Sequence, residues 1–256
     1  MAPCCLTAQN PIPAPEQSGS KIISGVTIHI GNGKEIQDGA VGFKDGKIDF
    51  VGSAALAPKG YSEVIAAKGK HVYPGFIAVN STLGLVEIGA VRASKDNREV
   101  GWMNPHVRSI ISYNTDSSIT PTVRVNGVLM GQISPQGGRI SGSSSVVTFD
   151  AWNWEDAAYA IDEGIHVNWP RLRKWNSKEK KRGPNKDYEK EVKELRSFLE
   201  RAKAYCQGNP KEVQLRESAA CGLFDEGKRL YVHCDRAPQM IRAINLAQDL
   251  DISKLT

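Results

Sequence analysis

The 256-residue sequence predicts an α/β protein in which a small β-rich subdomain precedes a (β/α) barrel. Short β-branched segments separated by turns occupy the first part of the chain, which is the pattern of a sheet of short strands. Apolar strand-like segments then alternate with helical segments, as they do in parallel sheets and barrels. An eight-fold barrel takes about 250 residues, and residues 72–256 are fewer than that. We therefore expect an incomplete barrel.

The first twenty residues are rich in Pro, Ser, Gln and Ala and show no periodicity, so residues 1–20 are predicted to be a disordered leader. Small residues before a Pro-rich stretch suit the remnant of a signal peptide. A periplasmic or secreted location follows from that interpretation, and a cytoplasmic location stays open. The chain has no apolar run of the roughly 20 residues that span a bilayer, so we expect no membrane association.

The β-rich subdomain is assigned to residues 21–71. Its clearest signal is Asp45-Gly46 between two short apolar segments, which predicts a tight hairpin turn. Another turn is expected at residues 67–70, after the last strand. The expected strands cover residues 22–30, 40–43, 48–51 and 63–66.

The partial barrel is assigned to residues 72–256 and opens with the longest apolar run of the region. Residues 72–80 are apolar almost without interruption, which predicts a strand buried on both faces. Residues 187–206 have apolar side chains at helical spacing and predict the longest helix. Further strands are expected at residues 127–133, 144–149, 164–167 and 228–235, and further helices at 121–125, 211–224 and 238–250.

Charge and cysteine content limit the classes of function. The net charge of +5 is too small for a dedicated nucleic-acid binder. Basic residues are concentrated between Arg171 and Arg182, with Trp169 and Trp175 nearby, and nucleic-acid binding there is the less favoured interpretation. We assign residues 171–186 to a solvated basic insertion loop. The five cysteines show no CxxC spacing, so we expect ordinary thiols rather than disulfides or a zinc knuckle.

The order of motifs between Ile22 and Leu85 resembles the amidohydrolase superfamily, including its imidazolonepropionase-like and dihydroorotase-like members. A strand, a Gly-Asn-Gly turn, the Asp-Gly hairpin and a Lys-Gly turn lead into Val72-Tyr73-Pro74-Gly75-Phe76-Ile77. In that superfamily the hairpins form half of a β-sandwich, and the Pro-Gly-Phe-Ile run is the first barrel strand. The segments Thr120–Gly142 and Leu230–Asp251 resemble later parts of the same barrel.

This resemblance implies a hydrolase of carbon–nitrogen bonds other than peptide bonds. A divalent metal, zinc in the first instance, would polarise an amide or cyclic amide carbonyl and lower the pKa of its bound water. Its ligands would come from the carboxyl ends of the barrel strands, because those ends converge on one mouth. The implied partner is a small-molecule substrate, and a homo-oligomer is compatible with the sequence.

The sequence departs from the superfamily at its metal-binding motif. Asn80 and Thr82 occupy the positions of the His-x-His pair, and their neutral oxygens are weaker zinc ligands than imidazole. One metal held by later ligands, a harder metal, and loss of metal chemistry all stay open. The alternative function is a catalytically inactive protein of the same fold that binds a small molecule or a partner.

The resemblance also implies the site residues. His233, at the end of a predicted strand, is expected to be a metal ligand, and Asn80 and Thr82 to line the mouth of the site. Arg139 and Ser141, in a Gly-rich loop, are expected to bind substrate, although a plain tight turn is an equal interpretation of that loop. For His166 a structural role is favoured. The general base and the remaining metal ligands are not assigned to this segment.

Overall fold

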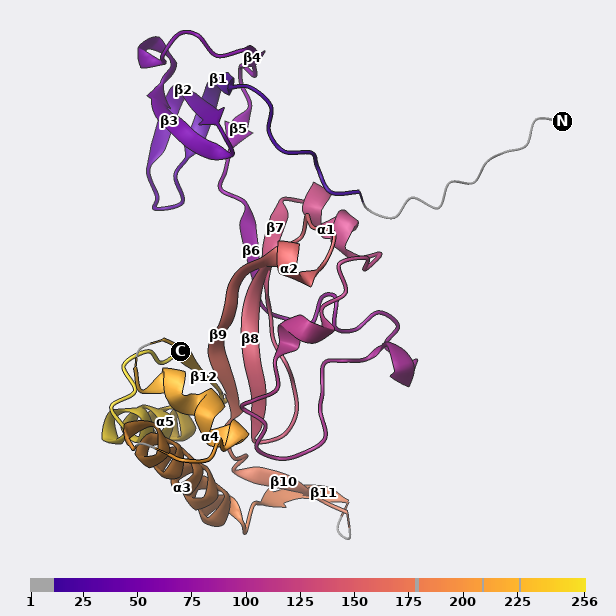
Figure 1. The fold of residues 1–256 in the computed structure, drawn as a ribbon, viewed down its shortest axis with the longest axis vertical. Helices are drawn as coiled ribbons and strands as arrows, with labels where there is room; N and C mark the ends of the chain where they lie inside the picture. The colour runs from indigo at the N-terminus through magenta and orange to yellow at the C-terminus, as the bar shows by residue number, and fades with distance from the viewer. Residues whose placement is uncertain (1–11, 178–179, 209, 226) are drawn as a thin grey trace, which may run out of the picture. The chain divides into compact units, whose positions relative to one another are not determined.

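A computed structural model describes residues 12–177, 180–208, 210–225 and 227–256 (Figure 1). Residues 1–11 of the expected leader therefore lie outside the described residues. The described chain forms two compact units, Ile12–Phe76 and Ile77–Thr256. No helix among the described residues is both long enough and apolar enough to cross a membrane.

The first unit is a five-stranded sheet with the order β3-β2-β1-β4, in which β5 also pairs with β1. Asp45 and Gly46 have φ angles of 51° and 70° and form the two-residue turn between β2 and β3, which confirms the predicted hairpin. Its small core contains Val26, Ile28 and Val41. The strands are β1 (Lys21–His29), β2 (Glu35–Lys44), β3 (Lys47–Ser53), β4 (Glu63–Ala66) and β5 (His71–Val72).

The second unit is built on a curled five-stranded sheet with the order β12-β9-β8-β7-β6, which is the incomplete barrel. Strand β8 runs antiparallel to both of its neighbours, and β9 and β12 are parallel. The parallel pairing typical of such barrels does not extend to β8, because β7 and β8 are joined by a short loop, which permits only antiparallel pairing. The strands are β6 (Phe76–Ser81), β7 (Val128–Ile133), β8 (Ile140–Thr148), β9 (Ala158–Asn168) and β12 (Arg229–His233).

The largest core lies between one end of this sheet and two helices. Leu195 of α3 and Leu246 of α5 pack in the same cluster as Ile165 of β9 and Leu230 of β12. The apolar stripe predicted for α3 is buried at Leu195, which confirms the helical spacing. The helices are α1 (Thr120–Val125), α2 (Trp154–Ala157), α3 (Tyr188–Gln207), α4 (Leu215–Ala220) and α5 (Ala237–Asp249).

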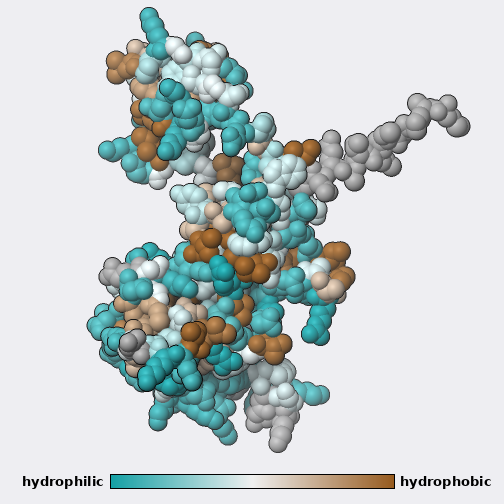
Figure 2. Space-filling model, in the orientation of Figure 1, coloured by the Kyte–Doolittle hydropathy of each residue, from teal (hydrophilic) through white to brown (hydrophobic). Residues whose placement is uncertain are grey.

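Strand β6 differs from its prediction, because it is not buried on both faces. The side chains of Ile77 and Val79 are 53% and 74% exposed. No second layer of the described residues covers these side chains, and β6 is also the edge strand of its sheet. Apolar side chains of β9 and α5 are also exposed, among them Tyr159, Ile161 and Ile241. Figure 2 shows such hydrophobic patches on the surface.

The basic segment at residues 171–186 was expected to be a loop, and that expectation was wrong. It contains two antiparallel strands, β10 (Arg173–Asn176) and β11 (Lys181–Pro184), which form a hairpin (Figure 1). Trp175 pairs with Arg182 across the hairpin. Aromatic side chains favour strands, and cross-strand pairs of this kind stabilise a hairpin even where most side chains are charged.

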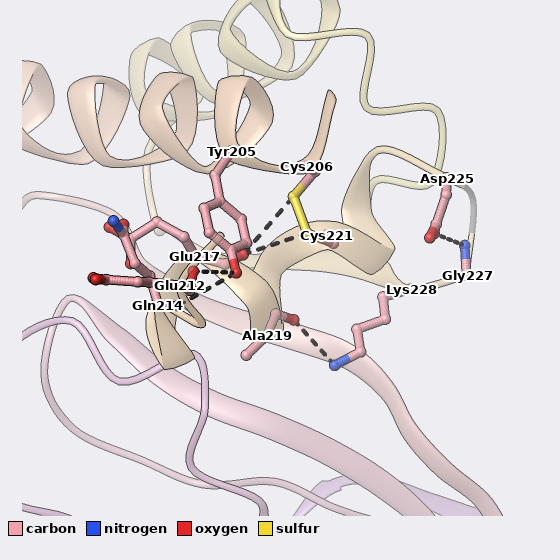
Figure 3. The surroundings of a disulfide bond; sticks show 10 residues. All are labelled: Tyr205, Cys206, Glu212, Gln214, Glu217, Ala219, Cys221, Asp225, Gly227 and Lys228. Carbon is pink, nitrogen blue, oxygen red and sulfur yellow. Dashed lines mark hydrogen bonds between the residues drawn. A yellow bond between two sulfur atoms is a disulfide. The ribbon is translucent and has the colours of Figure 1, made fainter. Parts of the chain in front are cut away.

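The expectation of ordinary thiols fails for two cysteines, because Cys206 and Cys221 form a disulfide (Figure 3). Cys206 lies in the last turn of α3, and Cys221 follows α4 directly. The chain between them folds back so that α4 packs against α3, a tertiary contact that no CxxC motif signals. Cys234 is a free thiol. Cys4 and Cys5 lie outside the described residues.

The disulfide is expected to stabilise the second unit. The two cysteines are 15 residues apart, and closing a loop of that length contributes about 3 kcal/mol in the chain-entropy model. We expect the double substitution Cys206→Ser/Cys221→Ser to lower the free energy of unfolding by about 2–4 kcal/mol in urea titrations. The control Cys234→Ser leaves the disulfide intact. Equal stability of the double variant and the control would contradict this assignment.

Candidate active site

The ends of several strands meet at one cavity of about 420 Å³ in the second unit. Strands β7, β9 and β12 end at this edge of the sheet and β8 begins there, because β8 runs in the opposite direction. The cavity has a polar lining in which four basic side chains face two acidic ones. Its charged and histidine side chains are Arg98, Arg139, Arg171, Lys174, Glu191, His233 and Asp235, and Asn80, Trp102, Ser141 and Asn168 also line it.

Two histidines on adjacent parallel strands contact each other beside this cavity. His166 of β9 pairs with Tyr231 of β12 in the strand register, and His233 pairs with Asn168. The Nδ1 atom of His166 lies 2.9 Å from the Nε2 atom of His233. His166 is fully buried and stacks on Tyr231, whereas His233 reaches the cavity. The buried histidine thus fixes the ring of the accessible one.

Burial keeps both imidazoles neutral. It lowers the pKa of His166 to about 3, helped by the neighbouring His233, and it also lowers the pKa of His233 below its usual value. One ring must then donate to the other. Nε2 of His166 is buried without a partner among the described residues. A bare acceptor there costs less than an unpaired N–H, so we assign the donor role to Nδ1 of His166.

Arg139 occupies the cavity wall but already has several partners. Its guanidinium donates to the carbonyl oxygen of Asn168 at 2.6 Å and to Glu191 at 2.9 Å, and it lies 5.0 Å from the centroid of Trp102. Only 5% of Arg139 is exposed. Its Nε is buried and has no partner among the described residues. A substrate-binding role for Arg139 stays a prediction.

Glu191 is the acidic centre of this wall. Burial raises the pKa of its carboxyl. Hydrogen bonds from Lys174 and Asn185 and the charge of Arg139 lower the pKa by more than burial raises it, so the pKa lies below its usual value. Lys174 comes from the hairpin and Arg139 from the Gly-rich loop directly before β8. Glu191 therefore holds the Gly-rich loop and the hairpin to helix α3.

The Gly-rich loop that carries Ser141 is a tight turn fixed from within. Asn168 donates through Nδ2 to the carbonyl oxygens of Gly137 and Gly138, and Ser141 donates to Gly137 at 2.7 Å. Gly138 has a φ of 61°, and a Cβ there would lie 2.9 Å from the carbonyl oxygen of Trp102. Ser141 lines the cavity, so its substrate-binding role stays a prediction on a rigid loop.

The two residues at the His-x-His positions have different surroundings. Asn80 lines the cavity, and its backbone has a φ of 51°, a conformation that asparagine tolerates better than most residues. Its N–H donates to Gln132 at 3.0 Å. Thr82 is not among the lining residues, and its carbonyl oxygen accepts from the backbone of the turn that follows β6. Asn80 thus shares the cavity with His233, and Thr82 does not.

The zinc ion implied by the sequence resemblance does not fit the described donor set. Catalytic zinc takes three protein ligands and an open position. The described residues contain no group of three or more His, Cys, Asp or Glu side chains that could hold a metal. His166 and His233 supply two imidazoles at most, and neither the carboxylates of Glu191 and Asp235 nor the thiol of Cys234 completes a three-ligand group with them among the described residues. The amide of Asn80 is a weak zinc ligand.

Several polar residues of the cavity were missed by sequence reasoning, among them Asn168, Lys174 and Glu191. Asn168 had a usable signal, because it directly follows the strand predicted at residues 164–167 and lies two residues after His166. Glu191 had none, since an acidic residue in the first turn of a helix is ordinary. Its partners are Arg139 and Lys174, and only the tertiary fold brings them together.

The neutral histidine pair predicts a loss of stability in acid. Below pH 6.5 the unfolded chain protonates histidines that the folded chain keeps neutral, down to a pH near 3 for His166. Folding stability is therefore fully present above pH 6.5 and declines as the pH falls. We expect His166→Gln to remove about 2 kcal/mol of the decrease in unfolding free energy between about pH 7.5 and 5. Urea titrations across this range measure it, and equal decreases in both proteins would contradict the buried neutral state.

We compared the sequence and the structure of this chain with those of known proteins. No family model and no curated protein matches the sequence. Among solved structures, an amidohydrolase from Thermotoga maritima MSB8 superposes with a TM-score of 0.74 at 18% identity, over 92% of this chain and 63% of that chain. The present chain thus spans less than two thirds of that protein's length.

Two further structures match with lower scores. A triazine hydrolase from Arthobacter aurescens has a TM-score of 0.29 at 14% identity, over 91% of this chain and 51% of that one. A D-hydantoinase from Thermus sp. has a TM-score of 0.30 at 14% identity, over 90% and 55%. Scores this low do not bear on the fold. The superposition on the Thermotoga protein, together with the curled sheet and its preceding small unit, shows that this chain has the amidohydrolase fold.

Proposed function

We propose that the protein is a hydrolase of carbon–nitrogen bonds that acts on an amide or cyclic amide carbonyl of a small molecule. One observation carries this proposal: His233, oriented by His166, opens into a polar cavity at the carboxyl ends of strands β9 and β12. Enzymes built on barrels of this type have their active sites at that edge. The fold of the Thermotoga amidohydrolase supports the same choice.

In this proposal His233 is the residue that meets the reacting group. Its Nε2 is engaged by His166, so Nδ1 is the nitrogen left for a ligand in the cavity. With Nε2 accepting from His166, Nδ1 of the neutral ring carries the proton and can donate a hydrogen bond to a carbonyl oxygen. It would become an electron-pair donor for a metal only in the other tautomer, in which Nε2 of His233 donates to His166. The rigid loop around Gly138 and the buried Arg139 would orient the carbonyl and its substituents.

We retain His233 as the proposed metal ligand, although the described residues do not complete a metal site. Such a site would need donors from outside the described residues. The disulfide between Cys206 and Cys221 supports a periplasmic or secreted location in this proposal, since disulfides persist in oxidising compartments.

A second function is favoured by one specific observation. Asn80 stands in the cavity where the superfamily places an imidazole, and no third strong donor accompanies the two histidines among the described residues. The same cavity would then bind a small molecule without hydrolysing it. Turnover of a bound amide separates the two functions, because a binding protein returns its ligand unchanged.

The hydrolase proposal is tested on the full-length protein with a panel of hydantoins, cyclic imides and N-acyl amino acids. We expect His233→Ala to lower kcat/KM for any hydrolysed substrate by about 100-fold or more, the range typical when a group that binds the reacting centre is lost. The matched control is His71→Ala, because His71 forms a similar histidine contact of 2.8 Å with His29 in the other unit.

Metal content measured on the same three proteins tests the ligand role. We expect less bound divalent metal in His233→Ala than in wild type and in His71→Ala. Absence of bound metal from the wild type, or unchanged content in His233→Ala, defeats the ligand assignment. Binding of a panel member without any turnover would favour the second function.

A further inference from the structure

A second cavity, of about 920 Å³, lies between the β10–β11 hairpin and the start of helix α5. Four arginines line it, against a single carboxylate from Asp235. No ion pair joins any of the four guanidinium groups to a carboxylate of the described residues. The arginines are Arg171, Arg173, Arg182 and Arg236.

The hairpin register explains why two of these arginines share the cavity. Successive side chains of a strand point to opposite faces, so Arg173 and Trp175 lie on one face and Lys174 on the other. Arg182 pairs with Trp175 and lies on the same face as Arg173. The opposite face is anchored, because Lys174 contacts Glu191 of α3. The hairpin is thus held by one face, and its other face presents arginines to the cavity.

The remaining walls are fixed by hydrogen bonds that side chains donate to backbone carbonyl oxygens. Gln239, which is only 4% exposed, donates through Nε2 to the carbonyl oxygen of Pro170 at 2.7 Å and joins the first turn of α5 to the strand end. Asn185 donates to the carbonyl oxygen of Arg171 at 2.9 Å. Arg173 donates to the carbonyl oxygen of Arg182 at 2.7 Å. The arginines therefore stand on a preorganised frame.

Guanidinium groups gathered around one cavity repel each other, and a bound anion relieves that repulsion. Each guanidinium can also bind a carboxylate or phosphate through two parallel hydrogen bonds. The cavity adjoins the one that contains His233, because Arg171, Asp235 and Gln239 line both. A ligand in one cavity can therefore extend into the other.

We propose that this arginine cavity binds an oxyanion, a carboxylate or phosphate, that belongs to the ligand of the His233 cavity. Its use as a substrate subsite rests on the proposed hydrolase function, whereas anion binding itself does not. The substrates would then be acidic amides, with the carbonyl near His233 and the anionic group between the hairpin and α5.

Direct anion binding is measured by calorimetry on the full-length protein, with tricarballylate as the carboxylate probe and pyrophosphate as the phosphate probe. We expect at least one probe to bind, and Arg173→Gln/Arg182→Gln to weaken it about tenfold or more, as loss of charge-assisted hydrogen bonds does. The matched control is Lys180→Gln/Lys186→Gln. It removes the same charge from the same segment at exposed lysines that do not line the cavity.

Three results would overturn the proposal: no binding of either probe, equal weakening in both double variants, or tighter binding of a single-stranded oligonucleotide than of both small anions. The last result would identify a nucleic-acid surface instead. If hydrolysis is found, the arginine variant should raise KM for acidic amides and leave KM for neutral amides unchanged. Failure of the hydrolase proposal would leave the calorimetric result intact, so the two failures are distinguishable.

Discussion

The buried ion pair between Arg139 and Glu191 is the contact on which the candidate site depends. It joins the Gly-rich loop before β8 to helix α3, and the same two side chains also reach Asn168 at the end of β9 and Lys174 of the hairpin. Removing charges from water is costly, and such a pair is tolerated only when its remaining polar atoms are bonded. Most of them are, with one nitrogen of Arg139 as the exception.

The walls of both cavities, the one that contains His233 and the arginine cavity, depend on the contacts of Arg139 and Glu191. The loop, the strand end and the hairpin would otherwise be independent surface segments, which are usually mobile and imprecise as binding sites. Held by Glu191, they form continuous walls beside His233 on one side and between the hairpin arginines on the other. The histidine pair adds a second fixed element, because His166 is wholly enclosed and sets the orientation of His233.

Much of the fold could be predicted because its signals are local. The Asp45-Gly46 turn, the strand at Glu63–Ala66 and the apolar stripe of α3 depend on neighbouring residues only, and they are confirmed. The features that were not predicted depend on contacts between residues far apart in the sequence. The apolar run at β6 is exposed because no layer of the described residues covers it, and the direction of β8 depends on its pairing. A disulfide between Cys206 and Cys221 depends on how α4 packs against α3.

Some residues of the candidate site could likewise be predicted from the sequence, and others could not. Family resemblance led to His233, Asn80, Arg139 and Ser141, which all line one cavity although they are far apart in sequence. It could not lead to Glu191, whose role arises from partners on two other elements. Thr82 shows that the resemblance can also include a residue that is not at the site. Its position was carried over from the motif, but it lies outside the cavity, because the chain turns directly after β6.

The most direct measurement compares the unfolding free energies of Glu191→Ala and Glu189→Ala in urea titrations. Both remove one carboxylate from the first turn of α3, but Glu189 pairs with Arg242 at the exposed surface. Breaking a buried pair leaves an uncompensated charge and costs about 3–5 kcal/mol. We predict a loss of that size for Glu191→Ala and little change for Glu189→Ala. Equal, small effects of the two substitutions would contradict the central role of the Arg139–Glu191 pair.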